Sequence, residues 1–209
     1  MGQEERYRTA TWDGAQRRVL VTLLFTDLVG STRLAARLGD RRWSLLLRAH
    51  HGRVRDLLDR WGGFEVDDAG DGFFATFDAA TPAVLCATAV SVSLAELGLK
   101  VRAGLHTGEC IREGGKVRGI AVHAGARVVG RAAPGEVLVT RTVRDVAAGS
   151  DLTFEDRGSH ELRGLPGLWQ LYAAALDGSG VSTADQGARR QVSHVPRRAK
   201  RVGSLARTL

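Results

Sequence analysis

The sequence predicts an α/β fold, and three stretches support that prediction. The run from Arg18 to Phe25 is apolar and β-branched, as in a buried strand. Residues 34–60 repeat Leu and Val at helical spacing. Residues 64–77 place Gly-Asp-Gly between two apolar runs, which indicates a strand, a two-residue turn and a second strand. Helices and strands are therefore expected to share one domain.

The first half of the chain adds two helices to these strands. After the first strand, Ser31 or Thr32 can cap a helix that begins near Arg33. The helical spacing in residues 34–60 indicates two helices with a break near residues 39–40, and a Trp-Gly-Gly sequence ends the second of them. The hairpin then follows directly.

The second half of the chain alternates helices and strands. A helix from Asp78 to Gly98 has Pro82 in its first turn, where proline is favoured, and a glycine at its end. The other expected elements are a central strand at Lys100–Thr107, a helix at Gly119–Gly130, a strand at Glu136–Thr140, a short helix at Thr142–Ala148 and two or three strands within Thr153–Ala175.

The length of 209 residues predicts one domain with two tails. We place an N-terminal tail at residues 1–17, the domain at 18–175 and a C-terminal tail at 176–209. The net charge of +7 is concentrated after Asp177, where seven basic residues accompany one acidic residue, so this end carries +6 and the rest of the chain +1. The C-terminal tail also has few large apolar residues, and we expect it to be mostly disordered.

The basic tail has two interpretations. It is either a solvated segment or a binding element for a partner with acidic groups, a membrane surface or nucleic acid. If the protein binds nucleic acid through this tail, the binding should be sensitive to salt, and deletion of residues 178–209 should abolish it.

The sequence contains no feature typical of membrane insertion or secretion. No apolar run reaches the roughly 18 residues that a bilayer span needs, and residues 1–14 are polar and charged, unlike a signal peptide. We therefore expect a cytoplasmic protein with no transmembrane segment. Cys86 and Cys110 lack metal-type spacing, and we expect both to be reduced thiols in or near the core.

A carboxylate and a glycine turn follow the first strand, in the sequence FTDLVGST. Asp27 lies where the strand ends, and the helix N-terminus after Gly30 presents free backbone N–H groups, which bind anions. An adjacent carboxylate is what a hard, phosphate-bound cation needs. The stretch therefore predicts a metal-triphosphate site.

A second carboxylate, Asp71, is predicted at the tip of the hairpin in residues 64–77. Two carboxylates at two strand ends can hold one or two Mg2+ ions, about 3.5 to 4 Å apart, for in-line displacement at phosphorus. Either aspartate alone is also a common turn-former. Their joint occurrence with the phosphate-type turn favours the metal site.

Six motifs, in order from about residue 18 to 175, resemble the catalytic domain of class III nucleotide cyclases of the bacterial soluble subgroup. They are FTDLVGST, GDGFFATF, VRAGLHTGE, GIAVHAGARV, PGEVLVT and FEDRGSHELRGLPG. The resemblance implies a ferredoxin-like βααββαβ core with extra C-terminal strands. It also implies attack of the ribose 3′-hydroxyl of a nucleoside triphosphate on the α-phosphate, which gives a 3′,5′-cyclic nucleotide and pyrophosphate.

The resemblance implies the metal and phosphate ligands. Two divalent cations, Mg2+ or Mn2+, are expected at Asp27 and Asp71 with help from the Leu28 carbonyl. Arg163 occupies a position that a phosphate-binding Lys usually holds, and it keeps the charge. The backbone amides that are expected to cradle phosphate belong to Val29, Gly30, Ser31 and Thr32.

The resemblance also places a transition-state arginine at the end of the motif VHAGAR. This residue is Arg127, whose planar guanidinium suits the charge that develops on the α-phosphate; the alternative is an ordinary exposed helix arginine. His123 stands where many members have Asn, and it either orients the ribose or packs. His106, in an apolar strand, is expected to be a core histidine rather than a ligand.

The base-reading positions depart from the family pattern. In the adenylyl cyclases of the family that this chain resembles, two residues together read adenine. One is a Lys four residues before the second metal Asp, and the other is an Asp three residues before the Gly of the arginine helix. Here these positions hold Asp67 and Lys116, so the charges are exchanged. Ionised Asp67 only accepts hydrogen bonds and Lys116 only donates them, which fits uracil or guanine and mismatches adenine. The alternative is that Lys116 is a solvated residue of a Gly-rich loop.

We favour uracil, so the predicted reaction converts UTP to cyclic UMP. The chain is similar in this respect to bacterial pyrimidine cyclases, which lack the adenine-reading pair and make antiphage alarm signals. The first alternative is a guanylate cyclase that makes cyclic GMP from GTP, and the second is an adenylate cyclase. A further alternative is an inactive cyclase-like module that dimerises and regulates a partner.

The resemblance also implies a head-to-tail homodimer with composite active sites. Each site takes Asp27 and Asp71 from one protomer. The opposite protomer is expected to supply Asp67, Lys116, His123, Arg127 and Arg163.

Overall fold

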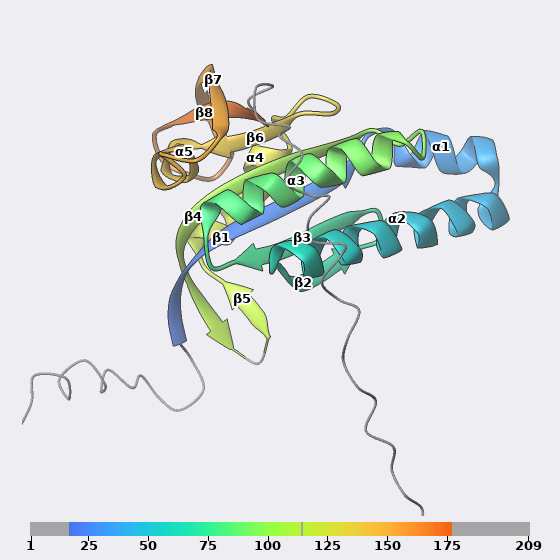
Figure 1. The fold of residues 1–209 in the computed structure, drawn as a ribbon, viewed down its shortest axis with the longest axis horizontal. Coiled ribbons are helices and arrows are strands. Elements are labelled where there is room, and N and C mark those ends of the chain that lie inside the picture. Colours follow the sequence, from blue (N-terminus) through green and yellow to red (C-terminus); the bar gives the residue numbers. More distant parts are fainter. Residues whose placement is uncertain (1–16, 114, 177–209) are drawn as a thin grey trace, which may run out of the picture. The chain divides into compact units, whose positions relative to one another are not determined.

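A computed structural model describes residues 17–113 and 115–176 of this chain, and the structural statements below concern those residues. They form an eight-stranded sheet covered by helices (Figure 1). The predicted tails, 1–17 and 176–209, lie outside the described residues except for Arg17 and Leu176, which belong to strands.

The elements follow the predicted order of a strand, two helices, two strands, a helix and further strands. They are β1 (Arg17–Leu28), α1 (Ser31–Leu38), α2 (Asp40–Trp61), β2 (Phe64–Ala69), β3 (Gly72–Phe77), α3 (Ala80–Ala95), β4 (Val101–Glu113), β5 (Lys116–Arg118), α4 (Ile120–Val129), β6 (Val137–Thr140), α5 (Arg141–Val146), β7 (Leu152–Glu161) and β8 (Leu168–Leu176).

The sheet order is β2-β3-β1-β4-β6-β8-β7, with β5 paired to β4. Strand β1 is central and pairs antiparallel with both β3 and β4. In this register Asp27 lies opposite Arg102 of β4, and Thr26 lies opposite Phe73 of β3. The end of β1, the start of β4 and the β2–β3 turn therefore meet at one edge of the domain.

Helices cover both faces of this sheet. Helices α2 and α3 lie on the near face in Figure 1 and bury Val54, Leu58 and Val90 against the sheet. Helix α4 packs on β1 and β4 through small residues at helical spacing, Ala121, Ala124 and Gly125. The predicted α/β fold with a βααββαβ order is confirmed, and two C-terminal strands, β7 and β8, extend the sheet beyond that core.

Strand β4 is longer than the sequence predicted. It was expected at Lys100–Thr107 and extends to Glu113, where it turns back into β5. The added part has the sequence GECIRE, with no polar–apolar alternation, and it pairs with the first residues of β1, where Arg17 lies opposite Arg112. Since that pairing partner is about 95 residues away in sequence, local pattern alone did not reveal it.

The start of α1 also differs from the prediction. The helix begins at Ser31, not near Arg33, and its N-cap is Gly30, so neither Ser31 nor Thr32 supplies a capping side chain. Gly30 has φ +72°, a left-handed conformation that favours glycine over residues with a Cβ atom. This conformation lets the chain turn sharply from β1 into the helix.

Two further expectations concern the thiols and the membrane. Cys86 and Cys110 are both free and buried, as predicted, and burial raises the pKa of the Cys86 thiol to about 12. Among the helices that the structure describes, none combines the length and the apolar character that a membrane crossing requires.

Two buried histidines carry strongly lowered pKa values. His50 of α2 is 0% exposed, and its ring nitrogens have no hydrogen-bond partner within the described part of the chain. Burial and then the neighbouring His51 lower the pKa of His50 to about 4, against the opposing charge of Asp71. His106 is the predicted core histidine: its Nδ1 lies 3.0 Å from Thr140 Oγ1, and burial lowers its pKa to about 4.

We expect the free energy of unfolding to fall as the pH is lowered from 6.5 to 4. Below pH 6.5 the unfolded chain protonates these histidines, whereas the folded chain does so only near pH 4, so acid favours the unfolded state. The loss is roughly 3 kcal/mol for each residue over that range.

Urea denaturation at pH 7 and pH 5 tests this expectation with His50→Leu. The stability lost between these pH values should be smaller than in the wild type by roughly 2 kcal/mol. His160→Leu, a partly exposed position on β7, is the control. An equal loss in wild type and His50→Leu would contradict the prediction.

Candidate active site

Asp27 occupies the end of β1 and is held by Arg102. Two guanidinium nitrogens of Arg102, Nε at 2.8 Å and Nη2 at 2.5 Å, donate to Asp27 Oδ2. Each side chain keeps about a third of its surface exposed, 33% for Asp27 and 34% for Arg102. Both hydrogen bonds use the same carboxylate oxygen, so Oδ1 is left for another ligand.

Asp71 lies in the two-residue turn between β2 and β3, as the sequence predicted. The turn begins with Gly70 at φ +72°. Asp71 and Asp27 line the same cavity, of about 380 Å³, so the two carboxylates that are 44 positions apart in the chain are brought together.

Two aromatic side chains contribute to the lining of this cavity, which we call the carboxylate cavity. Phe25 of β1 and Phe74 of β3 stack with ring centroids 4.4 Å apart and an interplanar angle of 6°. Asp67 lies opposite Phe74 in the β2–β3 register and is exposed within the same cavity. The cavity is lined by Phe25, Thr26, Asp27, Asp67, Asp71, Gly72, Phe73, Phe74, Arg102, Ala126, Val129 and Gly130.

A second cavity, of about 370 Å³, connects Asp71 to the start of α1, because Asp71 lines it together with Ser31 and Thr32. The first intrahelical bond of α1 runs from Leu34 N to Gly30 O at 3.0 Å. The amides before Leu34 therefore lack an acceptor inside the helix, which makes the α1 N-terminus suited to an anion.

One of the predicted phosphate-binding amides, that of Val29, already has a hydrogen-bond acceptor in the protein. Val29 N donates to Lys100 O at 2.8 Å, so this amide is already used by the backbone that leads into β4. The amides of Gly30, Ser31 and Thr32 are the better placed of the four to bind phosphate, and the phosphate-binding role of all four stays a prediction. Leu28 is 4% exposed with its side chain in the core, and a metal-binding role for its carbonyl stays a prediction.

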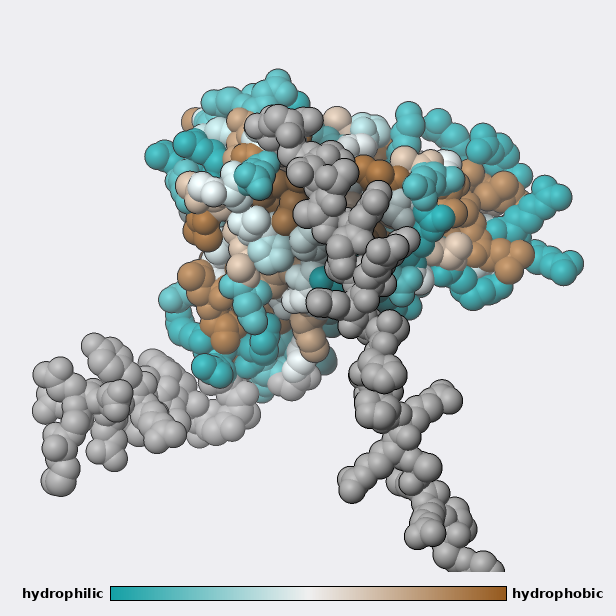
Figure 2. Space-filling model, viewed as in Figure 1, coloured by the Kyte–Doolittle hydropathy of each residue, from teal (hydrophilic) through white to brown (hydrophobic). Residues whose placement is uncertain are grey.

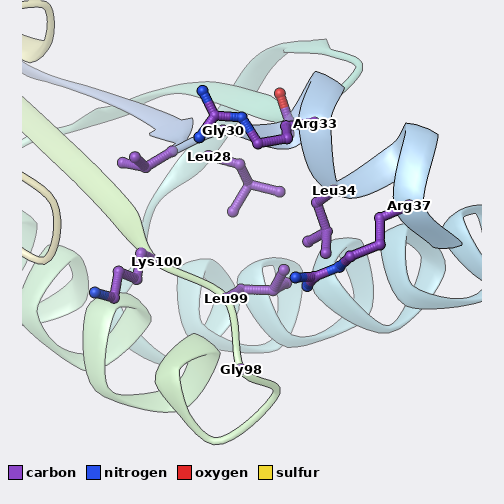
Figure 3. Close-up of a pocket in the computed structure, with 10 residues that line it drawn as sticks. Leu28, Gly30, Arg33, Leu34, Arg37, Gly98, Leu99 and Lys100 are labelled. Carbon is purple, nitrogen blue, oxygen red and sulfur yellow. The ribbon is translucent and has the colours of Figure 1, made fainter.

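A third cavity, of about 530 Å³, lies on the other side of the same turn (Figure 3). Leu28, Leu34 and Leu99 form its apolar part, and Arg37 extends from α1 toward Leu99. Its lining contains no acidic residue. It contains three cationic ones, Arg33, Arg37 and Lys100, whose charged side-chain groups have no hydrogen bond or ion pair with the described residues. The turn before α1 is therefore surrounded by uncompensated positive charge.

Arg127 and His123 share the outward face of α4. Together with Ile120 they follow the spacing i, i+3, i+7, and all three are exposed, Ile120 by 66%. Neither Arg127 nor His123 lines the carboxylate cavity of the same chain. Arg127 Nε donates instead to Arg163 O at 3.3 Å, so the structure brings together the predicted transition-state arginine and the predicted phosphate-binding arginine.

Arg163 follows β7, in a turn anchored by Leu162, which is 2% exposed. Lys116 opens the short strand β5 and is exposed, which places it on a strand and not in the Gly-rich loop considered above. The carboxylate cavity does not include Lys116, and no ion pair between Asp67 and Lys116 is found within the described residues. Their joint role in base recognition stays a prediction.

The carboxylate cavity supplies some, but not all, of the ligands that a divalent cation needs. The described residues contain no group of three or more His, Cys, Asp or Glu side chains arranged to hold a metal ion. Asp27 and Asp71 supply two carboxylates in one cavity. Mg2+ is commonly bound by one or two carboxylates and completed by substrate phosphates and water, so these residues fit a metal that arrives with a nucleotide.

The surface of the domain also exposes large hydrophobic side chains. Figure 2 shows hydrophobic residues between hydrophilic ones over the face that it presents. The most exposed are Leu168, Ile120, Leu20 and Val92, at 69%, 66%, 65% and 63%. Ile120 is notable because it shares its helix face with Arg127, which makes that face a candidate contact surface.

Sequence reasoning missed Arg102, the direct partner of Asp27, and Lys100, whose carbonyl fixes Val29. Arg102 could have been found only from the pairing of the two central strands, since it lies opposite Asp27 in the β1–β4 register. An arginine within a strand is not distinctive by itself, and the contact of Arg102 with Asp27 depends on that register.

Comparison with known proteins agrees with this geometry. Residues 14–174 match the family model described as "Adenylate and Guanylate cyclase catalytic domain". The chain is 28% identical over 158 residues to "Putative adenylate cyclase 3" of Rhizobium meliloti, covering 71% of this chain and 27% of that protein. It is 32% identical over 152 residues to an uncharacterized protein of Mycobacterium tuberculosis, covering 70% of this chain and 52% of that one. The chain thus spans between a quarter and about half of these relatives.

Solved structures show the same fold. The adenylyl cyclase CyaB from P. aeruginosa superposes with a TM-score of 0.74 at 20% identity, covering 78% of this chain and 96% of that one. The guanylyl cyclase Cya2 gives 0.73 at 23% identity, with coverages of 80% and 97%. Because the family model spans most of the chain and the fold agrees, this chain belongs to the adenylate and guanylate cyclase catalytic domain family.

Proposed function

We propose that this protein is a nucleotide cyclase, which converts a nucleoside triphosphate to a 3′,5′-cyclic nucleotide and pyrophosphate. One observation carries the proposal: Asp71 lines both the cavity that contains Asp27 and the cavity at the α1 N-terminus. A carboxylate pair and a phosphate-binding turn are therefore neighbours, as a metal-bound triphosphate requires. Family membership supports the same reaction class.

The chemistry is the formation of one bond to phosphorus and the cleavage of another. The ribose 3′-oxygen loses its proton to solvent and bonds to the α-phosphorus, and the bond from that phosphorus to the pyrophosphate oxygen breaks, so that pyrophosphate leaves. Asp27 and Asp71 would hold two divalent cations, which would supply activation of the hydroxyl and neutralisation of charge on the triphosphate. The protein residues then contribute positioning and charge stabilisation.

The residues around the α1 turn hold the triphosphate. The amides of Gly30, Ser31 and Thr32 donate to phosphate oxygens, and the helix dipole favours the negative charge. Arg33, Arg37 and Lys100 add positive charge around the same turn, which favours the highly charged pyrophosphate as it leaves. Arg102 orients Asp27 through two hydrogen bonds to Oδ2, which would leave Oδ1 for a metal ion.

Arg127 and Arg163 act from a second copy of the chain. Helix α4 packs its small residues on the sheet and exposes Arg127, so this side chain is unable to enter the carboxylate cavity of its own protomer without unpacking the helix. A head-to-tail homodimer places the exposed α4 face over the partner's carboxylates. Arg127 then meets the charge on the α-phosphate, Arg163 binds the triphosphate, and His123 orients the ribose.

The exchanged charges at Asp67 and Lys116 support UTP as the substrate. From the opposite protomer, Asp67 accepts from uracil N3 and Lys116 donates to O4. GTP is the second candidate, because guanine offers the same donor and acceptor order at N1 and O6. In this chain Asp67 lines the cavity with Asp27 and Asp71, so its contribution from the opposite protomer stays a prediction. A signalling role of cyclic UMP in antiphage defence likewise stays a prediction.

A competition between nucleotides tests the function and the base together. Purified protein is incubated with equimolar ATP, GTP, UTP and CTP and Mn2+, and cyclic products are separated by mass spectrometry. We expect mainly cyclic UMP. Asp67→Lys/Lys116→Asp, which restores the adenine-type charges, should shift the product toward cyclic AMP by on the order of 10²-fold or more in relative rate.

The outcomes of this competition separate the alternatives. Mainly cyclic GMP selects the guanylate cyclase. Mainly cyclic AMP from the wild type contradicts the base assignment and leaves the cyclase reaction intact. Absence of every cyclic product, from protein that is folded and dimeric, favours the inactive regulatory module.

A further inference from the structure

The turn that carries Asp71 is held by contacts on two sides. On one side it meets β1, where Phe73 N donates to Thr26 Oγ1 at 3.1 Å. A Cβ atom at Gly72 would lie 2.6 Å from Thr26 O, so only glycine allows the hairpin to approach the strand this closely. Since Thr26 precedes Asp27, this contact couples the two carboxylate-bearing segments.

On the other side the turn meets α2 through His51. Its Nε2 lies 2.7 Å from Gly70 O, and because a carbonyl oxygen only accepts, Nε2 carries the proton and donates. The His51 ring also contacts the edge of Phe73, with centroids 5.2 Å apart and an interplanar angle of 85°. Helix α2 is itself fixed in the core by Val54 and Leu58, each 2% exposed.

His51 therefore ties a rigid helix to the residue immediately before Asp71. Gly70 adopts a left-handed conformation, with φ +72°. Because glycine has no Cβ atom to restrict its φ and ψ angles, the backbone at this position would be free to rotate without a further contact. Metal-binding carboxylates need positioning to within about 0.5 Å, and groups that support the ligands commonly decide metal affinity.

We propose that His51 is a positioning residue that fixes the direction of the Asp71 carboxylate for divalent cation binding. The inference rests on the proposed function, because it takes Asp71 as a metal ligand. His51 touches neither the metal nor the nucleotide. It acts through the hydrogen bond to Gly70 O, which stops the turn from rotating when the cation and the triphosphate bind.

Two substitutions separate the hydrogen bond from ring packing. His51→Phe keeps a ring against Phe73 and removes the donor, whereas His51→Gln keeps an N–H donor and removes the ring. His160→Ala is the matched control, since His160 Nε2 lies 2.8 Å from Arg157 O on β7, a bond of the same kind remote from the carboxylates.

The test measures Mn2+ binding by electron paramagnetic resonance in the presence of 3′-deoxy-UTP, which lacks the attacking hydroxyl and so reports binding without turnover. We expect His51→Phe to raise the half-saturating Mn2+ concentration by roughly 10-fold or more, His51→Gln to stay within about 3-fold of the wild type, and His160→Ala to be unchanged. Thermal unfolding is recorded for each variant.

The inference is overturned if His51→Phe binds Mn2+ as the wild type does, or if the Phe and Gln variants weaken binding equally. It is also overturned if the wild-type complex binds no Mn2+. Failure of the proposed function looks different: the wild-type protein then forms no cyclic nucleotide from UTP, while the Mn2+ titrations still decide the role of His51.

Discussion

Replacing Asp71 with Asn is expected to lower the rate of cyclic nucleotide formation at saturating substrate by roughly 10³-fold or more. Asn preserves the size of the side chain and its place in the β2–β3 turn but removes the negative charge that a divalent cation needs. Asp27→Asn should have a similar effect, because both carboxylates line one cavity. The measurement is the initial rate of cyclic product formation at saturating Mn2+ and nucleotide.

The two variants should differ in one respect. Asp27→Asn also removes the charge partner of Arg102, leaving that half-buried guanidinium with a neutral acceptor, whereas the structure gives Asp71 no ion pair among the described residues. We therefore expect a loss of stability only in Asp27→Asn. Asp59→Asn, an exposed position at the end of α2, is the control. Activity of either variant within a factor of about ten of the wild type would rule out the two-carboxylate site.

Mixing two inactive variants is expected to restore activity. In a head-to-tail dimer, Asp27→Ala removes the carboxylate side of a site and Arg127→Ala removes the arginine side. A dimer with one copy of each variant has one site with both changes and one site with neither. Random exchange in an equal mixture makes about half of the dimers mixed, so about one quarter of the wild-type activity should return.

The same mixing experiment has a built-in contrast. Asp27→Ala mixed with Asp71→Ala should remain inactive, because both residues lie on the same side of every site and no dimer contains an intact one. Equal amounts are mixed, subunit exchange is allowed, and cyclic nucleotide is measured against each variant alone. Failure of the Asp27→Ala and Arg127→Ala pair to recover activity would mean that Arg127 serves the site of its own protomer.

Much of the fold and part of the candidate site could be predicted from the sequence. The strand before Asp27, the hairpin tip at Asp71 and the helix of Arg127 each have a local signal, namely an apolar β-branched run, a Gly-Asp-Gly turn and helical spacing of small residues. Prediction was weaker where structure depends on distant pairing, as at the end of β4. It was also weaker at the α1 start, where backbone conformation at Gly30 replaces side-chain capping.

By itself, the sequence determined the order of elements, the six linked motifs and hence the family, because these depend on local periodicity and on residue identity at fixed spacing. Only the tertiary structure decided which groups meet. The β1–β4 register sets Arg102 against Asp27, the turn backbone commits Val29 N to Lys100 O, and α2 brings His51 to the Gly70 carbonyl. Each of these contacts joins residues at least 19 positions apart, where no local pattern specifies the partner and close packing of the whole sheet does.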